Sequence, residues 1–176
     1  RRQFAEALNR YAARHHRECS GGRERLEITY QTVSSVTDPA AEVEVLTEQL
    51  RAHMESHQGA ERASRMCLSG PHKDDLTVEL NGMSAKTFAS QGQTRTAALS
   101  LKLASREIFY QETGEWPVLL LDDVLSELDS RRQEYLIGKT GGGQVIITCC
   151  ERTQRLRQLQ GAAFLVEGGI IAPLNQ

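Results

Sequence analysis

The sequence lacks long apolar runs and paired cysteine motifs. Its 176 residues include four cysteines, four prolines and one tryptophan. No apolar stretch approaches the roughly 20 residues that a membrane-spanning helix needs, and no signal-peptide pattern opens the chain. The cysteines form no CxxC pair, and Cys149 and Cys150 are adjacent, which suits neither a zinc site nor an ordinary disulfide. We therefore expect no membrane partner, and buried, reduced thiols in an intracellular protein.

The chain also lacks a strong charge of either sign. Its 21 basic and 23 acidic residues give a net charge of −2, so any contact with nucleic acid requires a local basic patch or parts outside this sequence. Hydrophobic residues at 39% and charged residues at 25% are typical of a soluble globular domain. Because there is no initiating methionine and Arg1 lies inside a helical pattern, we interpret the sequence as part of a longer protein.

The first 64 residues predict a helix, a strand and a second helix. Apolar positions at helical spacing run through residues 1–18, and alternation over residues 26–30 predicts a half-buried strand. Asp38 and Pro39 are predicted to open the second helix, as its N-cap and first-turn residue. We assign residues 1–64 to a small, mainly helical arm.

From residue 65 onward, strand and helix patterns alternate, which favours an α/β architecture. Asn81-Gly82 predicts a hairpin turn, because both residues tolerate positive φ. The unbroken apolar run at residues 118–121 predicts a parallel strand covered on both faces. The other predicted elements are strands at 66–68 and 144–148, helices at 90–110, 130–138 and 153–159, and a hairpin of 163–166 with 170–172.

Three segments together indicate phosphate chemistry. Ser90-Gln91-Gly92-Gln93 opens a helix, whose unpaired N–H groups attract anions. Asp122-Asp123 ends the apolar strand at the sheet edge where ligands bind, so one acid can hold Mg²⁺ and the other can orient a water. Each piece alone also fits a structural role, as a plain N-cap or as solvated acids. The ordered combination, with residues 125–129 as its third segment, is more specific.

In this order the segments resemble the RecF family of SMC-like, ATP-binding-cassette (ABC) ATPases. Ser90-Gln91-Gly92-Gln93 is similar to the signature loop, residues 119–123 to the Walker B strand, and Ser126-Glu127-Leu128-Asp129 to the D-loop. Gly70-Pro71-His72-Lys73-Asp74-Asp75-Leu76 is similar to a stretch typical of this family. The resemblance implies that residues 65–176 form the C-terminal lobe of a P-loop NTPase head, with Walker A outside the sequence.

The resemblance also implies a role for each motif residue. Asp122 would be the acid linked to Mg²⁺, and Asp123 stands where most ABC proteins have a catalytic Glu, so slow hydrolysis is expected. Ser90, Gln91 and Gly92, with Gln93 completing the loop, would contact the γ-phosphate of ATP bound to the opposite subunit. Asp129 would lie at the dimer seam. Thr148 is the candidate to replace the switch His that many members have.

For the intact protein, the resemblance implies a cytoplasmic, nucleoid-associated ATPase that uses ATP and Mg²⁺. It would dimerise around ATP, bind DNA at gaps and junctions, and act with RecR and RecO to assemble recombinase. Two alternatives stay open: the head of another SMC-like, RecN-like or OLD-type ATPase, and a non-catalytic module that binds a partner such as RecR. A Gly-x-x-x-x-Gly-Lys-Ser/Thr loop upstream of Arg1 would support the ATPase.

Three other patterns receive structural interpretations. Gly138-Lys139-Thr140 ends like a Walker A loop, but Gln133 stands where that motif needs its first Gly. His53 and His57 have the spacing of a two-His metal pair without the HExxH order, and we expect them at the surface. The basic residues of the first helix are interpreted as a solvated face, with contact to a DNA backbone as the alternative. They are Arg1, Arg2, Arg10, Arg14, His15, His16 and Arg17.

The isolated 176-residue chain is expected neither to bind ATP tightly nor to hydrolyse it. The Walker A backbone and lysine that hold the β- and γ-phosphates are not in this sequence. A calorimetric titration of the chain with ATP measures the affinity. An affinity like that of a complete ATPase would contradict the motif assignment.

Overall fold

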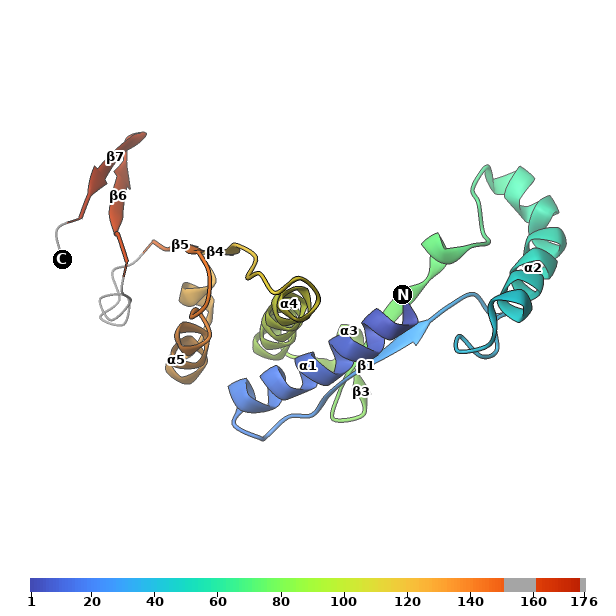
Figure 1. Ribbon diagram of the computed structural model, residues 1–176, viewed down its shortest axis with the longest axis horizontal. Helices are drawn as coiled ribbons and strands as arrows, with labels where there is room; N and C mark the ends of the chain where they lie inside the picture. Colours follow the sequence, from blue (N-terminus) through green and yellow to red (C-terminus); the bar gives the residue numbers. More distant parts are fainter. Residues whose placement is uncertain (151–160, 175–176) are drawn as a thin grey trace. The chain divides into compact units, whose positions relative to one another are not determined.

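The computed structural model describes residues 1–150 and 161–174, which form two compact units (Figure 1). The units are Arg1–Gly114 and Glu115–Gln176, whereas the sequence placed a boundary after residue 64. The difference has a physical reason. Strand β1 (Leu26–Gln31) pairs along its whole length with β2 (Asp75–Leu80), so the first 64 residues share a sheet with the segment that follows.

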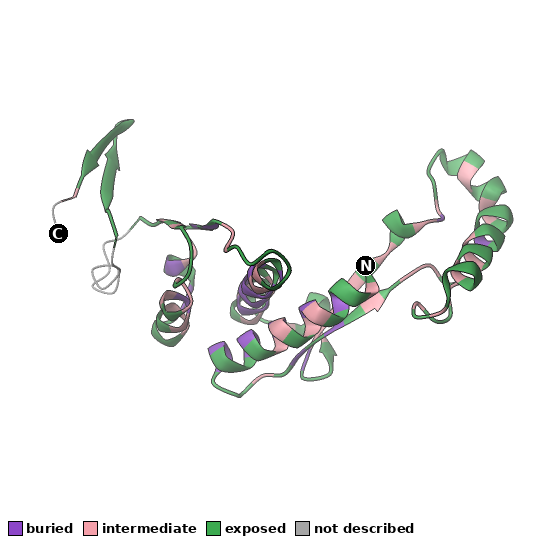
Figure 2. Ribbon diagram, in the orientation of Figure 1, coloured by how far each residue is buried: buried purple, intermediate pink, exposed green. Residues whose placement is uncertain are grey.

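The first unit combines two long helices with an antiparallel sheet. Helix α1 (Arg2–Ser20) packs against both α4 (Gln91–Thr113) and β1. The sheet has the order β1-β2-β3, and β3 is only Met83–Ser84. Buried residues concentrate on these elements (Figure 2). The core of the unit comprises Leu8, Ala12, Leu26, Ile28, Leu80, Ala97, Ala104 and Ile108.

The predicted Asn-Gly turn is confirmed. Asn81 and Gly82 both have positive φ, at 53° and 79°, and they join β2 to β3. The Asn81 side chain accepts a hydrogen bond from the backbone N–H of Arg25 at 2.8 Å, which fixes the turn against the start of β1. The chain then passes through the short helix α3 (Ala85–Phe88) to Ser90, so the hairpin leads directly into the start of α4.

Two local predictions in the first unit are wrong. Helix α2 (Val43–Ser64) begins at Val43, because Asp38 instead caps a separate turn, in which its carboxylate accepts from Ala40 N at 2.8 Å. Residues 66–68 form no strand. They lead irregularly to the short 3₁₀ helix Pro71–Lys73, and the carboxylate of Glu61 accepts from the backbone N–H of Leu68 at 2.7 Å. Side-chain contacts here replace the hydrogen bonds that a strand pairing would supply.

The second unit contains a parallel strand pair, a helix and a hairpin. Strand β4 (Leu119–Asp122) pairs in parallel with β5 (Val145–Thr148), as expected. Only alternate residues of β4 are buried: Leu121 is 3% exposed, whereas Leu120 is 61% exposed, so the prediction of two covered faces is wrong for these residues. The remaining elements are the 3₁₀ helix Leu125–Glu127, α5 (Ser130–Gly138), and the predicted hairpin of β6 (Phe164–Glu167) with β7 (Ile170–Pro173).

The helix predicted at 153–159 lies outside the described residues. Within the described part of the chain, no helix is both long and apolar enough to cross a membrane.

Candidate functional site

The N-terminus of α4 forms a capping box around Ser90. The Ser90 hydroxyl accepts from Gln93 N at 3.3 Å, and Gln93 Oε1 accepts from Ser90 N at 2.9 Å. The next first-turn N–H groups, those of Gln91 and Gly92, have no partner within a helix by geometry. Ser90, Gln91 and Gly92 are all exposed, so this positive end of a 23-residue helix faces solvent.

Gly92 has no local structural reason to be glycine. A Cβ built at this position meets nothing within 4 Å among the described residues, and its φ is not positive. A glycine inside a helix costs about 1 kcal/mol relative to alanine. The position is therefore open for close approach by a group from outside the described structure, as a phosphate-binding loop requires.

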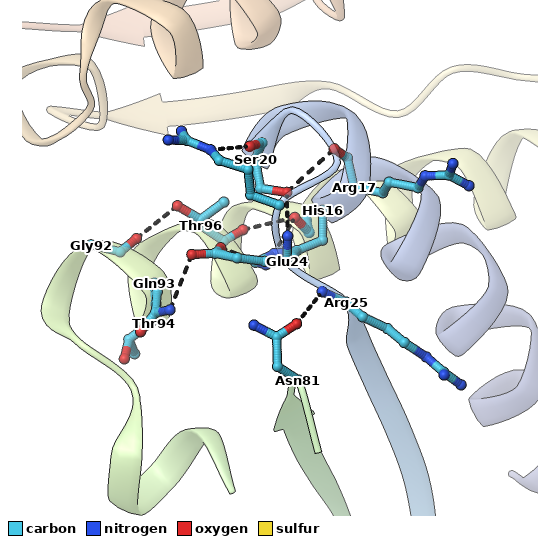
Figure 3. A network of polar contacts seen from close by, with 12 residues as sticks. His16, Arg17, Ser20, Glu24, Arg25, Asn81, Gly92, Gln93, Thr94 and Thr96 are labelled. Atoms are coloured by element: carbon cyan, nitrogen blue, oxygen red, sulfur yellow. Dashed lines mark hydrogen bonds and ion pairs between the residues drawn. The ribbon is translucent and has the colours of Figure 1, made fainter. Parts of the chain in front are cut away.

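A chain of polar contacts runs from this loop into the core (Figure 3). Gln93 Nε2 donates to Glu24 Oε1 at 3.0 Å, and Glu24 Oε2 lies 3.1 Å from His16 Nε2. His16 is fully buried on α1, and its other ring nitrogen lies 3.4 Å from the hydroxyl of Ser100 on α4. The prediction that His15 and His16 lie on a solvated face is wrong, because α1 turns both toward α4 and buries them. Glu24 belongs to no motif and meets Gln93 only through folding.

In the second unit, Asp122 and Asp123 lie where β4 ends beside β5. Asp123 has a φ of 48°, so the chain turns sharply after the strand. Its backbone N–H lies 3.1 Å from both the carbonyl and the hydroxyl oxygen of Thr148, and the Thr148 hydroxyl donates to the Asp122 carboxylate. Ser126 Oγ then donates to Asp123 O at 2.8 Å. The structure thus brings Thr148 to the two predicted acids.

Asp123 combines backbone strain with an unsatisfied carboxylate oxygen. A non-glycine residue in the left-handed region costs of the order of 1 kcal/mol or more, and such strain occurs preferentially at functional sites. Its Oδ1 is buried without a hydrogen-bond partner among the described residues, which adds a desolvation cost. Both features fit a residue whose partner is a ligand or a water.

The residues present fit a Mg²⁺ site only in part. Asp122 is exposed and Asp123 offers an unpaired oxygen, and oxygen ligands are what Mg²⁺ prefers. No group of three or more metal-ligating side chains occurs in residues 1–150 and 161–174. Mg²⁺ commonly binds through one or two carboxylates together with waters and substrate phosphates, so a nucleotide would have to complete this site.

Cys149, which follows Thr148, has a thiol with a raised pKa. Partial desolvation of the thiol is the main cause, and the neighbouring Cys150 and Asp123 raise the pKa further, so the protonated form is favoured. The prediction of buried cysteines holds for Cys19 alone, since Cys67, Cys149 and Cys150 are exposed. All four are free thiols, as expected.

Asp129 caps helix α5. Its carboxylate accepts from the backbone N–H groups of Arg131 at 3.1 Å and Arg132 at 2.9 Å, and it pairs with the Arg132 guanidinium at 2.5 Å. The backbone hydrogen bond from Arg132 is the main cause that holds the pKa of Asp129 below its usual value. These contacts orient the end of the predicted D-loop, while its place at a dimer seam stays a prediction.

The two motif-like patterns prove to be structural. Gly138 ends α5, and the N–H groups of Lys139 and Thr140 bond the last carbonyls of that helix, so the segment is a helix C-terminus rather than a phosphate loop. His53 is buried, which corrects its predicted surface position. Its Nδ1 lies 2.7 Å from the hydroxyl of Ser69, and its ring stacks on His57 at 3.9 Å.

Known proteins with similar sequences are RecF proteins. No family model matches the sequence. It is 39% identical over 173 residues to the DNA replication and repair protein RecF of Alkaliphilus oremlandii, covering 97% of this chain and 47% of the relative. It is 43% identical over 176 residues to that of Listeria innocua, covering 97% and 46%. The chain thus spans about half the length of the curated relatives it matches.

Solved structures show the same fold. Two structures of the recombination mediator protein RecF in the RecFOR pathway, described with ATP and with ATPrS, match with TM-scores of 0.81 and 0.80. Each is 35% identical, and the match covers 98% of this chain and 45% of the other. The fold is that of the C-terminal lobe of an ABC-type P-loop NTPase head. Over this length the chain is similar to RecF proteins in both sequence and fold.

The Asp129 cap predicts a pH dependence for the stability of the second unit. In the folded chain the pKa of the Asp129 carboxyl lies below the ordinary value of 3.8. The contribution of this carboxylate to the free energy of unfolding is therefore complete above that value and is lost as the pH falls through the folded pKa. Asp129→Ala should cost about 1 kcal/mol near neutral pH. The free energy of unfolding can be measured with denaturant and Trp116 fluorescence. The difference in this free energy between Asp129→Asn and the unmodified chain should become smaller under acid conditions. A difference that does not change with pH would contradict this role for the carboxylate.

Proposed function

We propose that this chain supplies the signature loop, Walker B acids and D-loop of a RecF-type ATPase that acts in DNA repair and recombination. In a full-length RecF protein carrying this chain, meaning a polypeptide as long as its curated relatives, ATP would join two subunits. The loop from Ser90 to Gln93 would contact the γ-phosphate held by the opposite subunit. The protein would bind gapped or junction DNA and act with RecR and RecO.

The observation that supports this proposal is the solvent-facing start of α4. Its capping box holds Ser90 in one place, while Ser90, Gln91 and Gly92 remain exposed and Gly92 leaves space for a close approach. An N-cap that served only α4 would need neither the exposed Gly92 nor its stability cost. A RecF structure described with ATP indicates which anion this helix start would bind, namely a phosphate group of ATP.

Asp122 and Asp123 would have separate tasks at the same site. Asp122, exposed at the end of β4, would hold Mg²⁺ directly or through water, and the bound ion would neutralise charge on the β- and γ-phosphates. Asp123, through its unpaired oxygen, would orient the attacking water. The side chain of Asp is shorter than the Glu usual in ABC proteins, so slow turnover is expected.

This division predicts different phenotypes for two isosteric variants. In the full-length protein, Asp122→Asn should weaken binding of Mg²⁺-ATP, because it removes the charge that holds the cation. Asp123→Asn should leave binding intact and slow turnover, so that the ATP-bound dimer accumulates. Nucleotide titration beside a phosphate-release assay separates the two. Equal affinities together with equal turnover would refute the division.

Ser90→Arg should abolish ATP-dependent dimerisation without preventing ATP binding to the monomer. The new side chain blocks the approach of the phosphate and removes a hydroxyl whose charge-assisted hydrogen bond is worth on the order of 1.5–3 kcal/mol at each of two symmetric sites. Sedimentation with ATP measures the dimer, and a titration measures monomer affinity.

The matched control is Ser105→Arg, the same change at an exposed serine of the same helix, about 22 Å further along. It should dimerise normally. If Ser90→Arg also dimerises normally, the start of α4 is only a capped helix end. If Ser90→Arg abolishes monomer binding as well, the loop acts within its own subunit.

A further inference from the structure

The orientation of the Gln93 side chain is set by contacts at both ends of its amide. Its Oε1 accepts from Ser90 N at 2.9 Å, and its Nε2 donates to Glu24 Oε1 at 3.0 Å. A carboxylate only accepts hydrogen bonds, so it can face the NH₂ group of the amide but not its oxygen. Glu24 therefore selects the amide orientation that places the oxygen on the Ser90 N–H and closes the capping box.

Glu24 is in turn held from the core. Its second oxygen lies 3.1 Å from Nε2 of His16, which is fully buried, and its backbone N–H donates to the Ser20 hydroxyl at 3.3 Å. The other ring nitrogen of His16 faces Ser100 of α4. A carboxylate bonded in this way at both oxygens has little rotational freedom. The contacts thus run from α1, through the turn before β1, to the first turn of α4 (Figure 3).

We propose that His16 and Glu24 are positioning residues for the signature loop, acting through Gln93 on Ser90. This inference rests on the proposed function, in which Ser90 contacts the γ-phosphate of the opposite subunit. A loop already fixed in its binding geometry does not lose conformational freedom when the dimer forms, so the pair lowers the entropic cost of dimerisation. Neither residue touches the nucleotide.

The same two helices provide a matched control pair. His15 is also buried on α1, and its Nε2 lies 3.0 Å from Glu107 Oε2 on α4. Burial alone would raise the pKa of Glu107, but hydrogen bonds from Arg14 and His15 hold it below its ordinary value. Glu107 follows Gln93 by 14 positions, about 21 Å along the helix. This pair joins the helices without reaching the signature loop.

The test compares Glu24→Ala with Glu107→Ala in the full-length protein. Glu24→Ala should raise the dimer dissociation constant at saturating ATP up to about 100-fold, since dimerisation must then order the loop at each of two symmetric sites, at a cost of up to about tenfold per site. ATP affinity of the monomer should not change. Glu107→Ala should lower the melting temperature while leaving the dimer constant unchanged.

Two further variants separate positioning from a general loss of structure. Glu24→Gln should restore most of the dimerisation, because its amide oxygen still accepts from Gln93 and its NH₂ can donate to the other tautomer of His16. Gln93→Met removes the hydrogen bond between Gln93 and Glu24 but leaves the His16–Glu24 pair intact. It therefore tests the same contact even if Glu24→Ala fails to fold. In the Gln93→Met background, Glu24→Ala should have little additional effect on the dimer constant.

Equal effects of Glu24→Ala and Glu107→Ala on the dimer constant would show that the His16–Glu24 pair is structural only. The same conclusion follows if Glu24→Ala and Gln93→Met both dimerise normally while Ser90→Arg does not. If Ser90→Arg itself dimerises normally, the proposed function fails, and the positioning role fails with it. The Ser90→Arg result therefore distinguishes the two failures.

Discussion

The packing of α1 against α4 is the interaction on which the first unit depends. The two helices share a core with β1 and β2, and small side chains at Ala12 and Ala104 are fully buried within it. Because α4 is fixed along its length, its first turn has a defined position and its N–H groups have a defined direction. The exposed start of α4 would be a frayed helix end without that support. The buried histidines of α1 extend the same contact with polar groups.

Local chemistry explains what the sequence could predict. The Ser90 cap, the Asn81-Gly82 turn and the apolar strand ending in Asp122 each depend on a few adjacent residues, whose conformational preferences act without the rest of the chain. The predicted signature loop therefore begins a helix in the structure, and the predicted Walker B acids end a strand. The nucleotide-binding roles proposed for these residues rest on resemblance and on the RecF relatives, not on spacing.

Long-range packing explains what the sequence could not predict. The boundary after residue 64 disagreed with the compact units because nothing local signals that β1 pairs with β2 across about 50 residues. His16 and Glu24 have no motif, and only folding places them beside Gln93. Asp38 looked like a helix cap because Asp-Pro serves turns and helix starts equally well. Leu120 on the exposed face of β4 is the same residue type as Leu119 and Leu121 on its buried face, so composition could not distinguish them.

We propose that the Ser90 loop of one subunit completes the Asp122 site of the other. The most direct test mixes full-length Ser90→Arg protein with Asp122→Asn protein and measures ATP turnover. Each variant alone should be inactive, since both of its sites lack one part. In the mixed dimer, the site with Asp122 from one subunit and Ser90 from the other is intact, so turnover should reappear. A mixture as inactive as its components would show that the Ser90 loop does not act on the site of the opposite subunit.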